Sequence, residues 1–286
     1  MQITYFQAPI QTIKVGGVPI AYRHIGVEGT TPIIYLNHLA ANLDGCDPII
    51  MDSLSKHFSI ISFDYQGIGL SGGSSALSVE EMAQETIALL QVLGYSKVHL
   101  LGLSLGGFVA QAMLRMAPHL IESVILAGTG PAGDKAISFV PRITFYDMLR
   151  GFLTGNDARY FLFFPKTTEA RHQAKAFIAR TQPRKNKDKP TTLKALLRQL
   201  RAVVSWAKAE PQDFSNVKHR VWVVNGDYDR MVPTAGSHDL AYRLPNASLT
   251  IYKGAGHGAI FQEAELFTQQ AIAFYKANDP LINNVK

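Results

Sequence analysis

The stretch LLGLSLGGFVAQA, residues 100–112, changes character at its centre. An apolar run typical of a buried strand meets Ser104, and a helical pattern follows it. A sharp strand-to-helix turn strains the backbone of its central residue, exposes that side chain and requires very small neighbours. Gly102 and Gly106 supply this room, in the G-x-S-x-G pattern of a nucleophile elbow. The stretch therefore predicts an exposed serine hydroxyl at a helix N-terminus, where free N–H groups favour negative charge.

Outward from this turn, apolar runs alternate with helical patterns. Predicted buried strands are 32–38, 58–64, 97–104, 121–128, 220–227 and 248–254, and predicted helices are 51–58, 78–94, 105–117, 234–244 and 262–277. Two β-rich runs around Gly16 and Gly17 predict an antiparallel hairpin at one edge. Short links between alternating strands and helices indicate the α/β class, with a mostly parallel eight-stranded sheet and helices on both faces.

Residues 131–213 interrupt this alternation. They hold no convincing β-run but contain three amphipathic helical segments, 144–153, 169–180 and 192–209. An insertion between two strands of an open sheet lies above the carboxyl ends of the strands, where such sheets bind ligands. We therefore predict a core domain of residues 1–130 and 214–286 and a helical cap of residues 131–213.

The cap is also the basic part of the chain. The net charge is +6 over 286 residues, and residues 131–213 alone hold 16 Lys and Arg against 7 Asp and Glu. The densest stretch, PRKNKDKP at 183–190, has no interleaved aromatic residues and has prolines at both ends. We interpret it as a solvated loop and expect no nucleic-acid partner.

Cysteine and apolar content narrow the class of protein further. The single cysteine, Cys46, excludes an intramolecular disulfide and a cysteine-based metal cluster. No apolar run approaches the ~20 residues that span a membrane, and the first residues lack the pattern of a signal peptide. We expect a cytoplasmic protein with a small-molecule substrate and no membrane partner, and its oligomeric state stays open.

A serine nucleophile needs a base and an acid, because a small polar residue in a tight turn would give the same pattern. His257 lies in GAGHGAIF, residues 254–261, on a glycine-rich loop after the last strand. Asp227 and Asp229 follow another buried strand; Asp229 lies farther into the loop and is our choice, whereas Asp227 is interpreted as capping the turn. Ser104, Asp229 and His257 then follow three separate strands in an order known for hydrolytic triads.

The negative oxygen of an acyl-transfer intermediate needs N–H donors. The N–H of Leu105, directly after the serine, is the first candidate. The second should come from NHLAAN, residues 37–42, after the strand 32–38. His38 in this loop could act as a second base, but we favour a structural role that shapes the loop.

Four motifs in order resemble the α/β-hydrolase superfamily, and the resemblance covers nearly the whole chain. They are GLSLGG at 102–107, NGDYDRMVP at 225–233, GAGHG at 254–258 and FDYQGIGLSGG at 63–73, with Asp64, Gly67, Gly69 and Ser71 in the last. The resemblance implies an α/β-hydrolase fold with a cap and a site without metal or organic cofactor. It also implies Ala40 as the second oxyanion donor, although Leu39 stands where the family usually has glycine.

Within the superfamily the chain is most similar to bacterial esterases, lactonases and cofactor-free haloperoxidase or perhydrolase relatives. Ser104 argues against epoxide hydrolases and haloalkane dehalogenases, which have aspartate at that position. We therefore expect a serine hydrolase that cleaves a small carboxylic ester or lactone through an acyl-enzyme. The alternatives are a C–C bond hydrolase of a diketone, which Leu103 disfavours, a perhydrolase or haloperoxidase, and a small-molecule receptor on the same fold.

Aromatic residues of the predicted cap are candidates for the wall of an apolar acyl pocket. They are Phe139, Phe145, Tyr146, Phe152, Tyr160, Phe161, Phe163, Phe164 and Trp206. Many of them must instead form the core of the cap, and we expect only about one in four to contact substrate.

Overall fold

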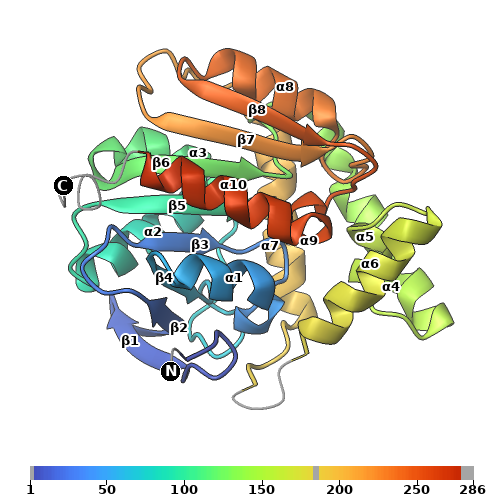
Figure 1. The fold of residues 1–286 in the computed structure, drawn as a ribbon, viewed down its shortest axis with the longest axis horizontal. Coiled ribbons are helices and arrows are strands. Elements are labelled where there is room, and N and C mark those ends of the chain that lie inside the picture. Colours follow the sequence, from blue (N-terminus) through green and yellow to red (C-terminus); the bar gives the residue numbers. More distant parts are fainter. Residues whose placement is uncertain (1–2, 183–186, 278–286) are drawn as a thin grey trace.

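A single eight-stranded sheet runs through the computed structural model, which describes residues 3–182 and 187–277. The strands are β1 (Gln11–Val15), β2 (Val18–Gly26), β3 (Ile33–Leu36), β4 (Ser59–Phe63), β5 (Val98–Leu103), β6 (Ile121–Ala127), β7 (Arg220–Gly226) and β8 (Ala247–Tyr252). Their order in the sheet is β1-β2-β4-β3-β5-β6-β7-β8 (Figure 1). The pairs β1–β2 and β2–β4 are antiparallel, and the other pairs are parallel. The predicted mostly parallel sheet with an edge hairpin is confirmed.

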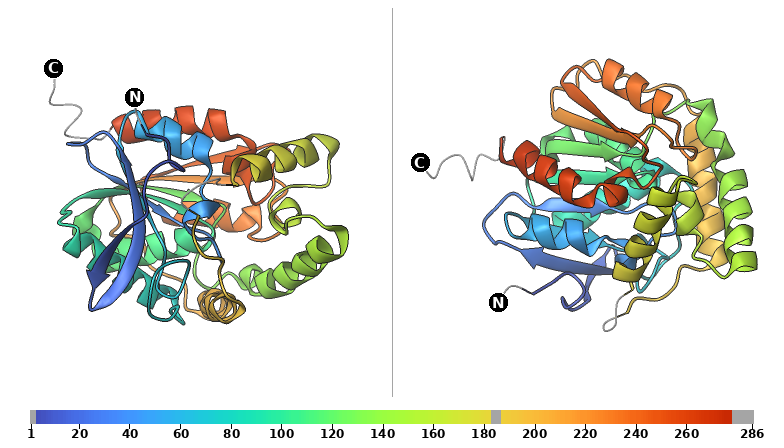
Figure 2. Two further views of the ribbon diagram at one scale, coloured as in Figure 1. Left: turned by 90° about the horizontal axis from the view of Figure 1, so that it is seen from below. Right: turned by 45° about the vertical axis from the view of Figure 1, so that its right-hand side comes forward.

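Helices cover both faces of the sheet (Figures 1 and 2). On one face lie α2 (Val79–Val92), α3 (Leu105–Met116) and α8 (Thr234–Arg243), and on the other α1 (Pro48–Ser55) and α10 (Ala264–Lys276). Every residue of β3, β4 and β5 is buried as a result. This double burial is the reason why the central strands read as continuous apolar runs.

Two helices have bounds in the structure that differ from those predicted. The helix expected at 51–58 begins at Pro48, because the side chain of Asp47 caps the N–H of Ile49 and proline suits the first helical position. The helix expected at 262–277 is divided at Glu263 into α9 (Ala259–Gln262) and α10.

The insertion between β6 and β7 is helical. It contains α4 (Val140–Thr154), α5 (Arg159–Leu162), α6 (Thr168–Arg180) and α7 (Leu193–Lys208). In Figure 1, α4, α5 and α6 lie beyond the arrowheads of the strands. Because β6 and β7 are neighbours in the sheet, the chain leaves it and re-enters it at adjacent strands. We keep residues 131–213 as the bounds of our proposed cap.

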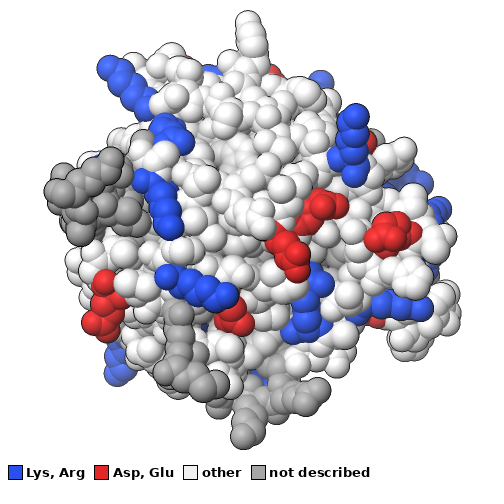
Figure 3. All heavy atoms as spheres, viewed as in Figure 1, with Lys and Arg blue, Asp and Glu red and all other residues white. Residues whose placement is uncertain are grey.

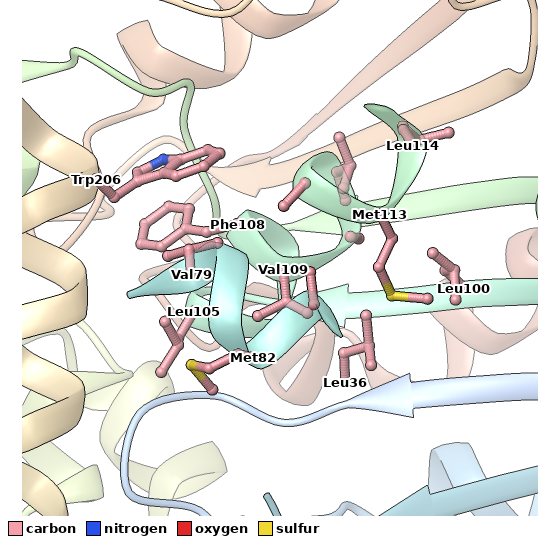
Figure 4. Close-up of a cluster of buried hydrophobic side chains, with 14 of the residues drawn as sticks. Leu36, Val79, Met82, Leu100, Leu105, Phe108, Val109, Met113, Leu114 and Trp206 are labelled. Atoms are coloured by element: carbon pink, nitrogen blue, oxygen red, sulfur yellow. The ribbon is translucent and has the colours of Figure 1, made fainter. Parts of the chain in front are cut away.

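One cap helix is anchored in the main core. Figure 4 shows Trp206 of α7 in a cluster with side chains of α2, α3, β3 and β5. Its ring stacks on Phe108 with the centroids 5.4 Å apart, and its indole N–H donates to the carbonyl of Gly130 at 3.3 Å. The base of α7 is therefore held by the same packing that holds the sheet.

Polar contacts also join the insertion to the core. Arg180, at the end of α6, donates to both carboxylate oxygens of buried Asp47, at 2.9 and 2.6 Å. Near the start of the last cap segment, Asp188 is buried and accepts from the N–H of Leu43 at 3.1 Å. The prediction of a solvated loop at 183–190 is thus wrong at Asp188, while residues 183–186 lie outside the described residues.

The surface carries charges of both signs. On the face in Figure 3, Lys and Arg are interspersed with Asp and Glu on a largely uncharged background. Within residues 3–182 and 187–277, no helix has the length and apolar character needed to cross a membrane. Nor do these residues contain a group of three or more His, Cys, Asp or Glu side chains placed to hold a metal ion.

Candidate active site

Ser104 occupies the turn between β5 and α3 with a strained backbone. Its φ is +55° and its ψ is −114°, in a region that residues other than glycine rarely adopt. The neighbouring structure holds this conformation: its N–H donates to the carbonyl of Ala127 at 2.8 Å, and its carbonyl accepts from Gly107 N at 2.8 Å and Thr129 Oγ1 at 3.0 Å. The serine is fixed at the edge of the sheet where the parallel strands end.

The two glycines beside Ser104 are there for space. A Cβ on Gly106 would lie 1.9 Å from the carbonyl oxygen of Leu36, and one on Gly102 would lie 2.5 Å from the carbonyl oxygen of Gly106. Real Cβ atoms essentially never make contacts this short, so larger residues would force α3 away from the sheet.

His257 lies within hydrogen-bond distance of the serine. It follows β8 on the predicted loop, its ring is almost fully buried, and its Nε2 is 2.9 Å from Ser104 Oγ. Its Nδ1 is 2.8 Å from Asp229 Oδ2. Because a carboxylate accepts, Nδ1–H must donate to Asp229, which leaves Nε2 to accept the hydroxyl proton of Ser104.

Asp229 is held in place by three N–H groups. Its Oδ2 accepts from His257, and its Oδ1 accepts from the backbone N–H groups of Met231 at 2.8 Å and Val232 at 2.9 Å. Asp227, by contrast, is exposed and accepts from the N–H of Gly254 at 2.7 Å, across the turn after β8. The structure thus brings Ser104, His257 and Asp229 into one chain of hydrogen bonds and leaves Asp227 outside it.

The two expected oxyanion donors differ in their present partners. Among the described residues no acceptor is found for the N–H of Leu105, at the start of α3. The N–H of Ala40 donates to Oε1 of Gln199, on cap helix α7, at 2.8 Å. Ala40 has φ +59° and follows Leu39 in a turn closed by a hydrogen bond from Ala41 N to His38 O at 3.1 Å. The N–H of Ala40 is therefore engaged by the cap.

His38 lines the site but, among the described residues, forms no hydrogen bond with the serine. Its Nδ1 lies 3.0 Å from the carbonyl of Leu39, so this nitrogen donates and Nε2 is left as an acceptor. Burial lowers the pKa of His38 to about 3, so the ring is neutral at ordinary pH. This arrangement agrees with a part in shaping the loop rather than with a second base.

A cavity of about 590 Å³ lies over the serine, between core and cap. From the core, Ser104, His257 and Phe108 line it, together with the loop from His38 to Asn42. Helix α4 contributes Val140, Thr144 and Met148, and α7 contributes Leu193, Leu196 and Val203. Most of these side chains are apolar, as in pockets that bind the hydrocarbon part of a small molecule.

Of the nine cap aromatic residues, Phe163 lines this cavity. Its ring lies between the two histidines, 5.8 Å from His257 and 5.0 Å from His38, centroid to centroid. Phe139, Phe145, Tyr146 and Phe152 are exposed instead, Tyr160 is half-buried, and Phe161, Phe164 and Trp206 are buried.

Sequence reasoning missed Gln199. The residue is buried on the face of α7 that also carries Leu196 and Val203, and its amide Nε2 has no partner among the described residues. A lone polar residue within an apolar helical stripe is the signal that could have identified it, because such groups are rarely buried without a reason. Its hydrogen bond to Ala40 is that reason.

Comparison with known proteins agrees with this architecture. A family profile described as alpha/beta hydrolase fold matches residues 31–264. An alpha/beta hydrolase fold protein from Chitinophaga pinensis has 32% sequence identity, with 95% of this chain and 98% of that chain covered at a TM-score of 0.91.

Two further similar proteins carry names of enzymes. A relative from Caulobacter segnis with the provisional name carbamate hydrolase RutD is 25% identical over 238 residues, which are 78% of this chain and 84% of that protein. The enol-lactonase from Burkholderia xenovorans LB400 has 20% identity and a TM-score of 0.75, with 93% of this chain and all of that chain covered, and it is similar in fold. The chain belongs to the alpha/beta hydrolase family and is a hydrolase.

Proposed function

We propose that this hydrolase cleaves a small carboxylic ester or lactone through an acyl-enzyme formed on Ser104. One observation carries the proposal: the hydrogen-bonded chain from Ser104 through His257 to Asp229, at 2.9 and 2.8 Å, opens on an apolar cavity. A serine is a weak nucleophile unless a base takes its proton, and this chain supplies the base and the group that orients it.

In the proposed reaction, His257 Nε2 takes the hydroxyl proton as Ser104 Oγ attacks the carbonyl carbon. Asp229 holds the ring in the required tautomer and stabilises the imidazolium that forms. The imidazolium then gives its proton to the leaving alcohol oxygen as the ester bond breaks. In the second half, His257 deprotonates a water molecule that attacks the acyl-enzyme, and Ser104 regains its proton when the acid leaves.

Stabilisation of the oxyanion is the step of the proposed reaction that involves the cap. The N–H of Leu105 has no acceptor among the described residues and can donate to the developing charge. We propose Ala40 as the second donor, which requires that Gln199 give up the hydrogen bond it now accepts. Formation of the tetrahedral intermediate would then be coupled to a change at α7.

Size and polarity of the cavity favour a small, largely apolar acyl group. Its 590 Å³ is within the range of pockets that enclose a small molecule. The wall from α4 and α7 is mostly apolar, and the polar residues of the lining include Asn42, Asp44 and Arg159 besides Ser104 and His257. A short-chain ester fits this distribution better than a polar substrate does.

The test is turnover and labelling by purified protein. We expect hydrolysis of short-chain p-nitrophenyl esters or of a lactone, and covalent labelling by a fluorophosphonate probe. Ser104→Ala should lose the label and at least about 10⁴-fold in kcat. Ser138→Ala, which removes a hydroxyl on the cap that bonds the carbonyl of Lys135, is the matched control and should keep both.

Two outcomes would contradict the proposal. If the protein cleaves no ester or lactone and takes no label, it does not act as a serine esterase. If Ser104→Ala still takes the label, another residue is the nucleophile. Including a diketone and a peroxide assay in the same panel tests the C–C hydrolase and perhydrolase alternatives, and a ligand that binds without turnover would indicate a receptor.

We also propose that the protein is located in the cytoplasm and that its partner is a small-molecule substrate.

A further inference from the structure

A second cavity, of about 520 Å³, borders the first. Leu162, Phe163 and His257 line both, so the second cavity reaches the proposed base. Its remaining wall comes from the helices α4, α5 and α6, which lie together in Figure 1, from the segment 164–167 before α6, and from the loops after β7 and β8. Nothing in the proposed mechanism uses this space.

Four cations line the second cavity, each from a different place in the fold. Arg150 comes from α4, Arg171 from α6, Lys166 from the segment before α6 and Arg230 from the loop after β7. No Asp or Glu of the described ranges, 3–182 and 187–277, is among its lining residues. The wall is therefore of one sign.

Two of these guanidinium groups pack on the same aromatic ring. The Cζ of Arg150 lies 4.0 Å from the centroid of Phe161, and the Cζ of Arg171 lies 5.2 Å from it. Arg230 donates to the carbonyl of Phe161 at 2.9 Å. Phe161 itself is buried, so the three arginines are gathered around one fixed point.

The positive charge around Phe161 is only partly compensated. Arg230 pairs with the buried carboxylate of Asp147. Arg171 donates to the carbonyl of Tyr160, and within the described part of the chain neither it, Arg150 nor Lys166 has an ion-pair partner. Burial lowers the pKa of Arg171; Tyr160 opposes this shift, and the nearby charge of Arg150 adds to it. Two guanidinium groups therefore repel each other in a partly buried wall.

An anion in this cavity would relieve the repulsion. Guanidinium groups bind carboxylate and phosphate through paired N–H donors, and partial burial strengthens the attraction because it excludes water. A wall with cations and no acid also attracts anions from solution.

We propose that the second cavity is a binding site for a small carboxylate or phosphate anion beside His257. The anion comes either from the substrate, as a charged group on the proposed ester, or from a free anion that modulates turnover. The substrate arm rests on the proposed function, but binding of an anion does not.

Binding is tested first without turnover. Calorimetric titration of the Ser104→Ala protein with inorganic phosphate and with succinate should show saturable binding that weakens as salt concentration rises. The double variant Arg150→Gln/Arg171→Gln, made in the same protein, should weaken binding by about tenfold or more. Arg142→Gln is the matched control, since Arg142 is exposed on α4 and outside both cavities.

Kinetics then separates the two sources of the anion. If the anion belongs to the substrate, the double variant raises KM for p-nitrophenyl hemisuccinate about tenfold and leaves kcat and the kinetics of p-nitrophenyl butyrate unchanged. If the anion is free, phosphate changes kcat for the butyrate ester in the wild type and not in the double variant.

Equal binding by the Ser104→Ala protein, its double variant and its Arg142→Gln variant, or no binding of either anion, would overturn the proposal whether or not the protein is an esterase. If the double variant does not fold, Arg150→Gln alone replaces it, because the Arg150 side chain makes no hydrogen bond among the described residues. Arg150→Lys/Arg171→Lys should restore part of the affinity, because it keeps the charge and loses the paired N–H geometry.

Discussion

At the scale of single residues, Asp229 and Asp227 stand two positions apart and have different surroundings. Asp229 is buried against His257 and two backbone N–H groups, whereas Asp227 is exposed. In the sequence, the only difference between the two aspartates is their distance from the end of the preceding strand. The difference comes from which carboxylate the loop turns toward the histidine.

Asp229→Asn should therefore disable the proposed triad. The N–H groups of Met231 and Val232 keep the amide oxygen on their side, so the amide N–H₂ faces His257 Nδ1 and enforces the wrong tautomer. We expect kcat for p-nitrophenyl butyrate to fall by about 10⁴, the size of this effect in a serine protease. Asp227→Asn is the control and should change kcat by less than about twofold; a large loss there instead would reverse the assignment.

The second prediction for a single residue concerns Gln199. Gln199→Leu keeps a similar volume but frees the N–H of Ala40. If that N–H serves the oxyanion, kcat for the ester should rise by about threefold or more, because the intermediate no longer competes with an amide oxygen. A fall in kcat at unchanged KM would show instead that Gln199 positions the loop.

At the scale of elements, the segment that leads into α7 is fastened to the core by a pair of carboxyl groups. Asp64, after β4, and Asp188 both accept from the N–H of Leu43, at 2.9 and 3.1 Å. Burial first, and then the hydrogen bond and charge of Asp188, raises the pKa of Asp64 well above its usual value. The N–H of Asp188 in turn donates to Asp44, which pairs with Arg23. The two carboxyl groups thus meet at the N–H of Leu43.

This pair predicts the pH dependence of stability. Because the pKa of Asp64 is raised on folding, its contribution is fully present below about pH 3.8, the unfolded value, and is lost as pH rises through the folded value. Asp188→Asn replaces the charge that repels the Asp64 carboxylate by a hydrogen-bond donor. The free energy of unfolding of this variant should therefore fall less with rising pH than that of the wild type. Urea unfolding of both proteins from pH 4 upward measures this; parallel curves would contradict it.

Elements were predictable where local signals agreed with burial. The helix expected at 78–94 is α2, which Ser78 caps through the N–H of Glu81, and the central strands read as apolar runs. The burial of Asp188 and the partner of Ala40 were not predictable, since each depends on segments more than 140 residues apart. Local pattern carries no information about such contacts.

At the scale of the whole molecule, the triad is a result of topology. Ser104, Asp229 and His257 follow β5, β7 and β8, which are parallel, so their carboxyl ends meet at one edge of the sheet. This is why chain order and strand position sufficed to choose these three residues. The cavity could not be predicted in the same way, because its wall depends on how the helices of the insertion pack over that edge.

Helix α4 shapes both the cavity and the outside of the molecule. One side carries Val140, Thr144 and Met148 into the cavity wall, while Phe152 and Leu153 near its end are 84% and 73% exposed. Phe152→Ser/Leu153→Ser should therefore leave ester turnover and the thermal midpoint within error and raise the concentration at which the protein precipitates. Light scattering during concentration checks this, and a lower thermal midpoint would show that these side chains are packed.

Cys46, the single cysteine of the chain, has a thiol buried beside the hydroxyl of Tyr5, 3.2 Å away, and burial raises its pKa to about 12. A thiol in that state is poorly reactive toward alkylating dyes. The native protein is thus a ready background for site-specific spectroscopy: Phe152→Cys would place one reactive position on the outside of α4. A fluorophore there would report in real time whether the helix moves when a substrate enters.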